Sequence, residues 1–244
     1  MILDRSVKIF ATPYLLAEEF SEEFVSWASE CEKSGSPFCV ALSGGSTPEL
    51  LFSVLGDHFS KSLKWENIHF FWGDERCVSP DDPQSNYGMT FKSLLGKIRI
   101  PESNIHRIMG EADPELEAVR YSAEIEGFLS QGKGLPRFDL IILGLGEDGH
   151  TASIFPSNDM LMEAEAVCAV ASHPVTRQKR ITLTGRVLNN AARVAFLVTG
   201  LNKAAVVEKI LNKKSSSENF PASGIVPVNG ELVWFLDNDA ASLL

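Results

Sequence analysis

Short, uninterrupted runs of apolar residues recur along this chain, and they constrain its fold more than any other feature of the sequence. The runs span residues 38–42, 68–72, 140–143 and 194–198. Runs of this length without polar alternation are typical of strands that are buried on both faces of a sheet. Amphipathic helical patterns lie between them. The sequence therefore predicts an α/β fold, in which helices cover both faces of a mostly parallel sheet.

The helical patterns follow the same order along the chain. They span residues 14–31, 85–95, 114–129 and 202–211, and another begins near Thr47 and Pro48. Thr47 followed by Pro48 has the pattern of an N-cap residue followed by a proline in the first turn. No internal repeat is present, and the only compositional break is a polar stretch at 213–219. We therefore expect one continuous domain from residue 1 to residue 244.

Charge and cysteine content narrow the classes of function. The chain carries 22 Lys and Arg against 32 Asp and Glu, a formal net charge of −10. This balance argues against binding to nucleic acid or to an anionic membrane, since both need clustered basic residues. The N-terminus places Asp4 and Arg5 after only three apolar residues, which is not the pattern of a signal peptide. The four cysteines lack the spacing of a zinc site or a disulfide framework, so we expect a cytoplasmic protein.

Polar and glycine-rich segments follow each of the apolar runs. They are Ser43-Gly44-Gly45-Ser46-Thr47, Gly73-Asp74-Glu75-Arg76, 144–150 and 199–203. In an open parallel sheet, ligands bind at the carboxyl ends of the strands, and these ends meet at one edge. The sequence therefore predicts a binding site built from these segments.

The segment SGGSTP at 43–48 has the features of an anion-binding loop. Its glycines allow close approach of the backbone, and N–H groups at the start of the next helix attract an anion, most often phosphate. It lacks the Gly-Lys-Ser/Thr ending of a Walker A loop, so it does not imply a nucleoside triphosphate. The alternative is a tight strand-to-helix turn that binds nothing.

The segment GLGEDG at 144–149 formally matches the dinucleotide pattern G-x-G-x-x-G. Glu147 and Asp148 would stand where a pyrophosphate approaches, and Pro156 would cut short the helix that should follow, so we expect no dinucleotide and no other cofactor. The loop instead presents His150 two residues after Asp148, a carboxylate that could orient it. A histidine in this setting is suited to take a proton from water near neutral pH, although a lone histidine is more often structural.

Three cationic side chains could hold an anion on this acidic chain. Arg76 could contact a phosphate through two hydrogen bonds, or it could pair with Asp74 instead. Lys203 lies near the start of a predicted helix, where it could contact the anion or remain solvated. Arg180 opens the alternating segment RITLT and could serve the anion or only the surface.

Seven motifs carry a resemblance to a known family. They are SGGSTP at 43–48, GDER at 73–76, SNYGM at 85–89, GLGEDGHTASIFP at 144–156, RITLT at 180–184, VTGLNKA at 198–204 and FPAS at 220–223. In order and spacing they resemble the 6-phosphogluconolactonases of the glucosamine-6-phosphate isomerase/6-phosphogluconolactonase family. Two departures from the family pattern are Gln84, where an acidic residue is common, and Ser157, where glycine is common.

The resemblance implies a Rossmann-like fold similar to the glucosamine-6-phosphate deaminase superfamily, without a nucleotide cofactor. It implies hydrolysis of 6-phosphoglucono-δ-lactone to 6-phosphogluconate in the oxidative pentose phosphate pathway, with His150 as the general base. Asp74, Asp148 and Arg180 match positions that line the pocket. The predicted catalytic residues are His150, Asp148 and Asp74, and the predicted phosphate-binding residues are Ser43, Gly44, Gly45, Ser46, Thr47, Arg76, Arg180 and Lys203.

A lactone is an activated ester, so attack by a water molecule that His150 deprotonates is sufficient. The sequence shows neither metal-ligand spacing nor a G-x-S-x-G nucleophile motif, so we expect no metal. The first alternative is an aminosugar-phosphate isomerase/deaminase. Those relatives place a glutamate five residues after the loop histidine and an aromatic residue after Asp-Glu, where this chain has Phe155 and Arg76. The second alternative is a sugar-phosphate-binding regulator, but the chain shows no DNA-binding segment.

Overall fold

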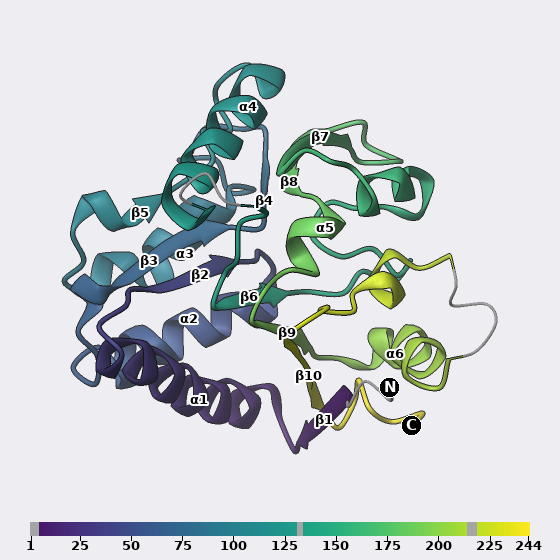
Figure 1. Ribbon diagram of the computed structural model, residues 1–244. Helices are drawn as coiled ribbons and strands as arrows, with labels where there is room; N and C mark the ends of the chain where they lie inside the picture. The colour runs from purple at the N-terminus through teal and green to yellow at the C-terminus, as the bar shows by residue number, and fades with distance from the viewer. Residues whose placement is uncertain (1–4, 131–133, 214–218) are drawn as a thin grey trace.

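A parallel sheet of seven strands forms the centre of the protein, in the order β1-β10-β9-β6-β2-β3-β5 (Figure 1). The computed structural model describes residues 5–130, 134–213 and 219–244, so most of the polar stretch at 213–219 lies outside it. Every neighbouring pair in this sheet is parallel, which confirms the predicted fold class. The strands are β1 (Arg5–Phe10), β2 (Phe38–Leu42), β3 (Ile68–Trp72), β5 (Ile105–His106), β6 (Leu140–Leu143), β9 (Arg193–Val198) and β10 (Glu231–Asp237).

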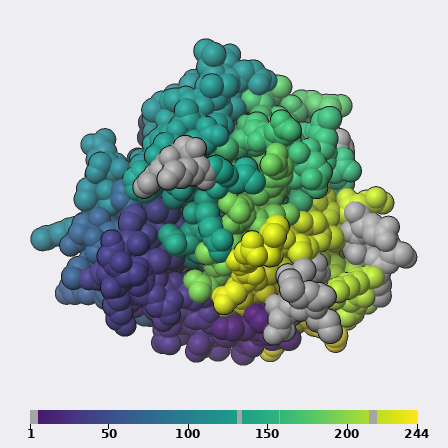
Figure 2. All heavy atoms as spheres, in the orientation of Figure 1, coloured from purple at the N-terminus to yellow at the C-terminus, as the bar shows by residue number. Residues whose placement is uncertain are grey.

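Each of the predicted apolar runs is a strand of this sheet. β2 and β6 lie in its interior and are buried at every residue, as strands covered on both faces must be. The first strand, β1, pairs with the last, β10, along its whole length. Figure 2 shows the purple N-terminal part and the yellow C-terminal part of the chain meeting at the lower edge of the molecule.

Helices cover both faces of the sheet. α1 and α2 lie on one side, while α4 and α5 lie on the other (Figure 1). No helix in the described residues is long and apolar enough to cross a membrane. The helices are α1 (Pro13–Lys33), α2 (Ser46–His58), α3 (Asn86–Ser93), α4 (Pro114–Ile125), α5 (Gly185–Leu188) and α6 (Ala204–Leu211).

A second, antiparallel sheet stands beside the carboxyl end of β3. It has the order β4-β8-β7, with β4 at Asp74–Arg76, β7 at Cys168–Ser172 and β8 at Lys179–Leu183. The GDER segment is therefore a short strand after Gly73, and not simply a loop. Gly73 donates its N–H to Leu42 of the main sheet at 2.8 Å and accepts the N–H of Leu183 of the second sheet at 2.8 Å. The backbone of Gly73 thus joins the two sheets.

Tyr121 of α4 completes the hydrogen bonding of β3. β5 pairs only with Phe70 and Phe71, so Trp72 has no partner there. The buried Tyr121 hydroxyl accepts the Trp72 N–H at 2.8 Å and donates to the Trp72 carbonyl at 3.1 Å. We expect Tyr121→Phe to lower the free energy of unfolding by about 1–3 kcal/mol, because it leaves a buried N–H unpaired. Urea unfolding measures this, and an unchanged midpoint would contradict it. Tyr121 does not line the site, so catalytic activity should be retained.

Candidate active site

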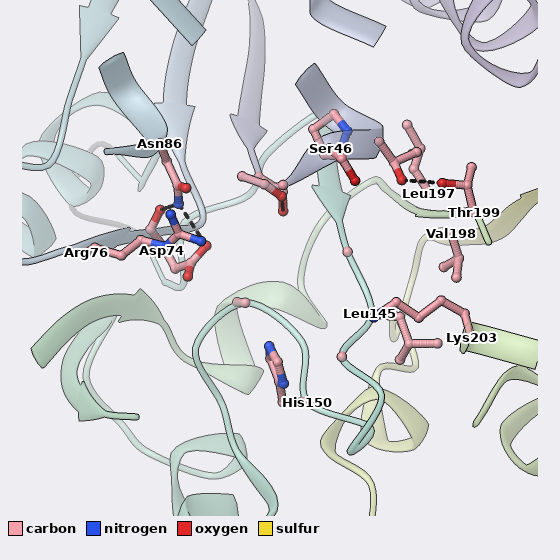
Figure 3. A pocket seen from close by; sticks show the side chains of 18 of the residues that line it. Ser46, Asp74, Arg76, Asn86, Leu145, His150, Leu197, Val198, Thr199 and Lys203 are labelled. Carbon is pink, nitrogen blue, oxygen red and sulfur yellow. Dashed lines mark hydrogen bonds between the residues drawn. The ribbon is translucent and has the colours of Figure 1, made fainter. Parts of the chain in front are cut away.

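A pocket of about 360 Å³ opens at the carboxyl ends of β2, β3, β6 and β9 (Figure 3). All four polar segments that were predicted at this edge of the sheet contribute to it. Asp148 does not itself line the pocket, but its Oδ1 atom lies 2.6 Å from Nδ1 of His150, which does. The other predicted site residues all line it: Ser43, Gly44, Gly45, Ser46, Thr47, Asp74, Arg76, His150, Arg180 and Lys203.

The loop from Ser43 to Thr47 connects β2 to α2 and forms one wall. Helix α2 begins at Ser46, and its N-cap residue is Gly45, with φ at 105° and no capping side chain. The predicted N-cap role of Thr47 is therefore wrong, and its hydroxyl oxygen lies 2.7 Å from Thr199 Oγ1 instead. Because Gly45 tolerates a left-handed φ, the chain turns into the helix soon after β2. Because the N-cap residue supplies no side-chain hydrogen bond, the first N–H groups of α2, together with the helix dipole, favour an anion.

His150 lies on the loop after β6, and its side chain is 26% exposed. Its Nδ1 atom lies 2.6 Å from Asp148 Oδ1, and its backbone N–H donates to the same oxygen at 3.2 Å. Burial raises the pKa of the Asp148 carboxyl group, but the charge and hydrogen bonds of His150 outweigh burial, and the pKa lies below its usual value. With Nδ1 facing the carboxylate, Nε2 is the ring nitrogen that remains available to a water molecule.

Asp74 is a buried carboxylate on another wall, with a side chain that is only 7% exposed. Its Oδ2 atom accepts the Ser153 hydroxyl at 2.6 Å and lies 3.9 Å from Arg180 Nη1. On the other side, Asn86 Nδ2 donates to the Asp74 carbonyl oxygen at 2.8 Å and lies 3.5 Å from Asp74 Oδ1. The carboxylate is therefore held from two sides.

Arg76 and Arg180 are paired residues of β4 and β8. The guanidinium of Arg76 donates to the carbonyl oxygen of Gln84, and Arg180 is the arginine that lies near Asp74. The alternative pairing of Arg76 with Asp74 is therefore wrong. Arg180 is also not a surface residue, since its side chain is 13% exposed and lines the pocket. Burial lowers the pKa of Arg180, and the Asp74 carboxylate offsets part of this effect. The guanidinium stays charged because the ordinary pKa of arginine lies far above neutral.

Lys203 approaches the pocket from another direction. Figure 3 shows it across the pocket from Arg76 and Asp74, with His150 between the two groups in this view. The preceding residue, Asn202, donates to Glu147 Oε1 at 2.7 Å and so ties this segment to the loop that carries His150. Cationic side chains therefore flank the pocket on two sides, although the chain as a whole is acidic.

The GLGEDG segment does not open a helix. The residues after it form a turn closed by an isolated bridge between Thr151 and Ile154. Gly149 has φ at 81°, and a Cβ atom there would lie 2.4 Å from the Phe220 ring. Both the backbone conformation and the close contact with Phe220 therefore require glycine at this position. Within residues 5–130, 134–213 and 219–244, no group of three His, Cys, Asp or Glu side chains could hold a metal ion.

No role was predicted for Asn86 and Ser153, although they lie in the motifs SNYGM and GLGEDGHTASIFP. They are 2% and 0% exposed, and both bond to Asp74. A polar residue at the start of a predicted helix was the only local signal for Asn86. Of the two departures from the family pattern, Gln84 accepts from Gln178 through its side chain at 2.9 Å, while the Ser157 side chain lies outside the described part of the structure.

Comparison with known proteins yields a consistent set of relatives. The family model described as glucosamine-6-phosphate isomerases/6-phosphogluconolactonase matches residues 11–234. A 6-phosphogluconolactonase of Aggregatibacter actinomycetemcomitans is 42% identical over 236 residues, which cover 96% of this chain and 98% of that protein. The structure of 6-phosphogluconolactonase from Trypanosoma brucei is similar with a TM-score of 0.85, 28% identity and 99% coverage of both chains. A monomeric glucosamine-6-phosphate deaminase, 24% identical, shares the fold with a TM-score of 0.82 over 98% of this chain and 100% of its own.

Proposed function

Since the chain belongs to the glucosamine-6-phosphate isomerase/6-phosphogluconolactonase family, we propose that it hydrolyses 6-phosphoglucono-δ-lactone to 6-phosphogluconate. This reaction is the second step of the oxidative pentose phosphate pathway. The observation that carries the proposal is the pairing of His150 with Asp148 at a pocket that also contains a helix N-terminus without a capping side chain. The pair suits proton transfer, and the helix N-terminus suits a phosphate.

In the proposed reaction, His150 Nε2 takes a proton from water while the water oxygen attacks the C1 carbonyl carbon. The bond between C1 and the ring oxygen then breaks, and the imidazolium returns the proton to that oxygen. Asp148 accepts the hydrogen bond from Nδ1, which orients the ring and stabilises its protonated form, as the carboxylate does in other His–Asp pairs. No covalent intermediate is needed, because a lactone is already an activated ester.

The phosphate of the substrate is proposed to bind at the N-terminus of α2, where Ser46 and Thr47 line the pocket. Lys203, Arg76 and Arg180 line the same pocket, and Figure 3 shows Lys203 across it from Arg76. These charges oppose the repulsion between an acidic protein and an anionic substrate. Asp74 is proposed to act on the substrate as the acceptor for a sugar hydroxyl, because among the described residues its Oδ1 atom has only the 3.5 Å contact with Asn86 Nδ2.

The isomerase/deaminase alternative is disfavoured by the residue beside the histidine. Those relatives carry a glutamate five residues after it, but this chain has Phe155, whose ring centroid lies 4.8 Å from that of His150. A phenyl ring cannot exchange protons. The hydrophobic contact holds the imidazole without adding a second acid or base.

The direct test uses purified protein and freshly prepared 6-phosphoglucono-δ-lactone, with proton release followed by stopped flow. We expect release well above the spontaneous rate, and no ammonia from glucosamine 6-phosphate. Proton release at the background rate would contradict the proposal. Tight binding of the sugar phosphate without turnover would favour a regulator instead.

We also propose that residues 1–244 act as one domain in the cytoplasm, with a sugar-phosphate lactone as ligand and neither nucleic acid nor membrane as partner. The four cysteines are all free thiols, which suits a reducing compartment. The pocket takes its residues from positions 43 to 203, and both adjoining sheets contribute to it, which suits a single domain.

A further inference from the structure

Asn86, at the start of α3, contacts both Asp74 and Gly44 of the candidate active site. It is the first residue of α3, it lines the pocket, and it is only 2% exposed. Its side-chain Nδ2 atom donates to the carbonyl oxygen of Asp74 at 2.8 Å, and it lies 3.5 Å from Asp74 Oδ1. Figure 3 shows the carboxamide beside Asp74 at the pocket wall.

The same carboxamide packs against Gly44 in the anion-binding loop. A Cβ atom at Gly44 would lie 1.8 Å from Asn86 Oδ1, 2.4 Å from its Cγ and 2.9 Å from its Nδ2, and these are the three nearest atoms. Gly44 is not among the described glycines with a positive φ. The need for glycine at this position therefore comes from the side chain of Asn86 and not from the backbone conformation.

Glu75 fixes the backbone from which Asn86 extends. The side chain of Glu75 is buried, and its Oε1 atom accepts the N–H groups of Arg76 and Asn86, each at 2.8 Å. Its Oε2 atom accepts the Tyr87 N–H at 2.8 Å and the Ser85 hydroxyl at 3.1 Å. Burial raises the pKa of Glu75, while the backbone hydrogen bonds act in the opposite direction. These hydrogen bonds tie the start of α3 to β4, so the backbone of Asn86 is held in place.

We propose that Asn86 is a positioning residue of the reaction, whose carboxamide holds the Asp74 carboxylate at a fixed separation from the anion-binding loop at Gly44. This inference rests on the proposed function, because the substrate has to contact the loop through its phosphate and Asp74 through its sugar. Ser153 restrains Asp74 Oδ2, while Asn86 Nδ2 donates to the Asp74 carbonyl oxygen and lies 3.5 Å from Oδ1. Without the carboxamide, Asp74 can shift and the loop can relax into the vacated space.

The test compares Asn86→Ala with a matched variant, Asn104→Ala. Asn104 is also buried, at 5% exposed, and its Nδ2 atom donates to the carbonyl oxygens of Glu66 and Ile68 at 2.8 and 3.0 Å. It does not line the pocket. Both substitutions remove a buried carboxamide whose Nδ2 atom has two oxygen partners, and Asn104 Oδ1 also accepts from the Ser103 hydroxyl at 3.2 Å, so Asn104→Ala should cost at least as much stability in urea unfolding.

Only Asn86→Ala should lower kcat, by about 10- to 100-fold, because small displacements of a substrate-positioning group cost this much. The loss should occur with phosphorylated and unphosphorylated glucono-δ-lactone alike, since Asp74 contacts the sugar. Asn86→Asp preserves the shape but removes the donor, and it should lose kcat as well. If the parent protein turns over the lactone and either Asn86 variant matches Asn104→Ala in kcat, the inference is wrong. If the parent has no lactonase activity, the proposed function is wrong.

A double-mutant cycle provides a second readout. Gly44→Ala alone should lower kcat/KM because its methyl group clashes with Asn86, but it should cost at least tenfold less in the Asn86→Ala background, where the space is open. A merely structural asparagine elsewhere would show no such rescue. Independent, multiplying losses from the two substitutions would overturn the packing argument.

Discussion

His150→Ala should lower the rate of lactone hydrolysis above the spontaneous background by about 10²- to 10⁴-fold, the range expected when a general base is removed. The imidazole is the group at the pocket whose Nδ1 atom faces a carboxylate at 2.6 Å, and alanine leaves neither a base for water nor a proton donor for the ring oxygen. Stopped-flow proton release with fresh lactone measures the effect. Competitive inhibition by 6-phosphogluconate should remain within a few fold of the parent, because the base acts on water and not on the phosphate.

His173→Ala is the matched control for this substitution. The ring centroid of His173 lies 5.2 Å from that of Phe155, the same ring that packs against His150, but His173 does not line the pocket. Removing it should leave most of the activity. Near-parental activity of His150→Ala, or an equal loss in both variants, would sink the assignment of His150 as the base.

Arg76→Ala and Lys203→Ala should each lower kcat/KM for the phosphorylated lactone by roughly 10- to 150-fold. A hydrogen bond to a charged group contributes about 1.5–3 kcal/mol, and each 1.4 kcal/mol corresponds to about tenfold in rate. Unphosphorylated glucono-δ-lactone lacks the anion, so its hydrolysis should change little. Some loss in kcat is compatible with the assignment, since binding energy from the phosphate also orients the lactone. Initial rates with both substrates make the comparison.

The effects of Arg76→Ala and Lys203→Ala are interpreted separately, because the two side chains lie on different sides of the pocket (Figure 3). Lys92→Ala removes an exposed lysine of α3 that does not line the pocket, and it controls for the loss of one positive charge. It should leave kcat/KM for both lactones unchanged. A variant of Arg76 or Lys203 that loses as much activity on the unphosphorylated lactone would place that residue at the reacting centre or in the fold.

The location of the site was predictable because it follows from the strands. The apolar runs at 38–42, 68–72, 140–143 and 194–198 are all strands of the main sheet, and a parallel sheet brings their carboxyl ends together. The contact between Asp148 and His150 was also predictable, since it spans only two residues. Strand positions and contacts between residues close in sequence can therefore be predicted from local sequence patterns.

The detailed partners of Asp74 were not predictable in this way. Ser153 is 79 residues away in sequence, and it reaches Asp74 only because the chain passes at Gly73 from one sheet to the next. The start of α2 was also misplaced, since Gly45 takes the N-cap position without any side-chain hydrogen bond. A pattern of residue types predicts a capping side chain, but it does not predict that the cap is left open beside a ligand pocket.

The pairing of β1 with β10 has a consequence for how the sheet assembles. Central pairs such as Phe38 with Ile68 close short loops, whereas the pair of Ser6 with Val233 encloses nearly the whole chain. Closing a long loop costs more chain entropy and slows the formation of a contact. During synthesis, β1 is made well before β10, so it cannot pair until β10 has also been made. The sheet is therefore expected to nucleate at its middle strands, and the pair of β1 with β10 forms later.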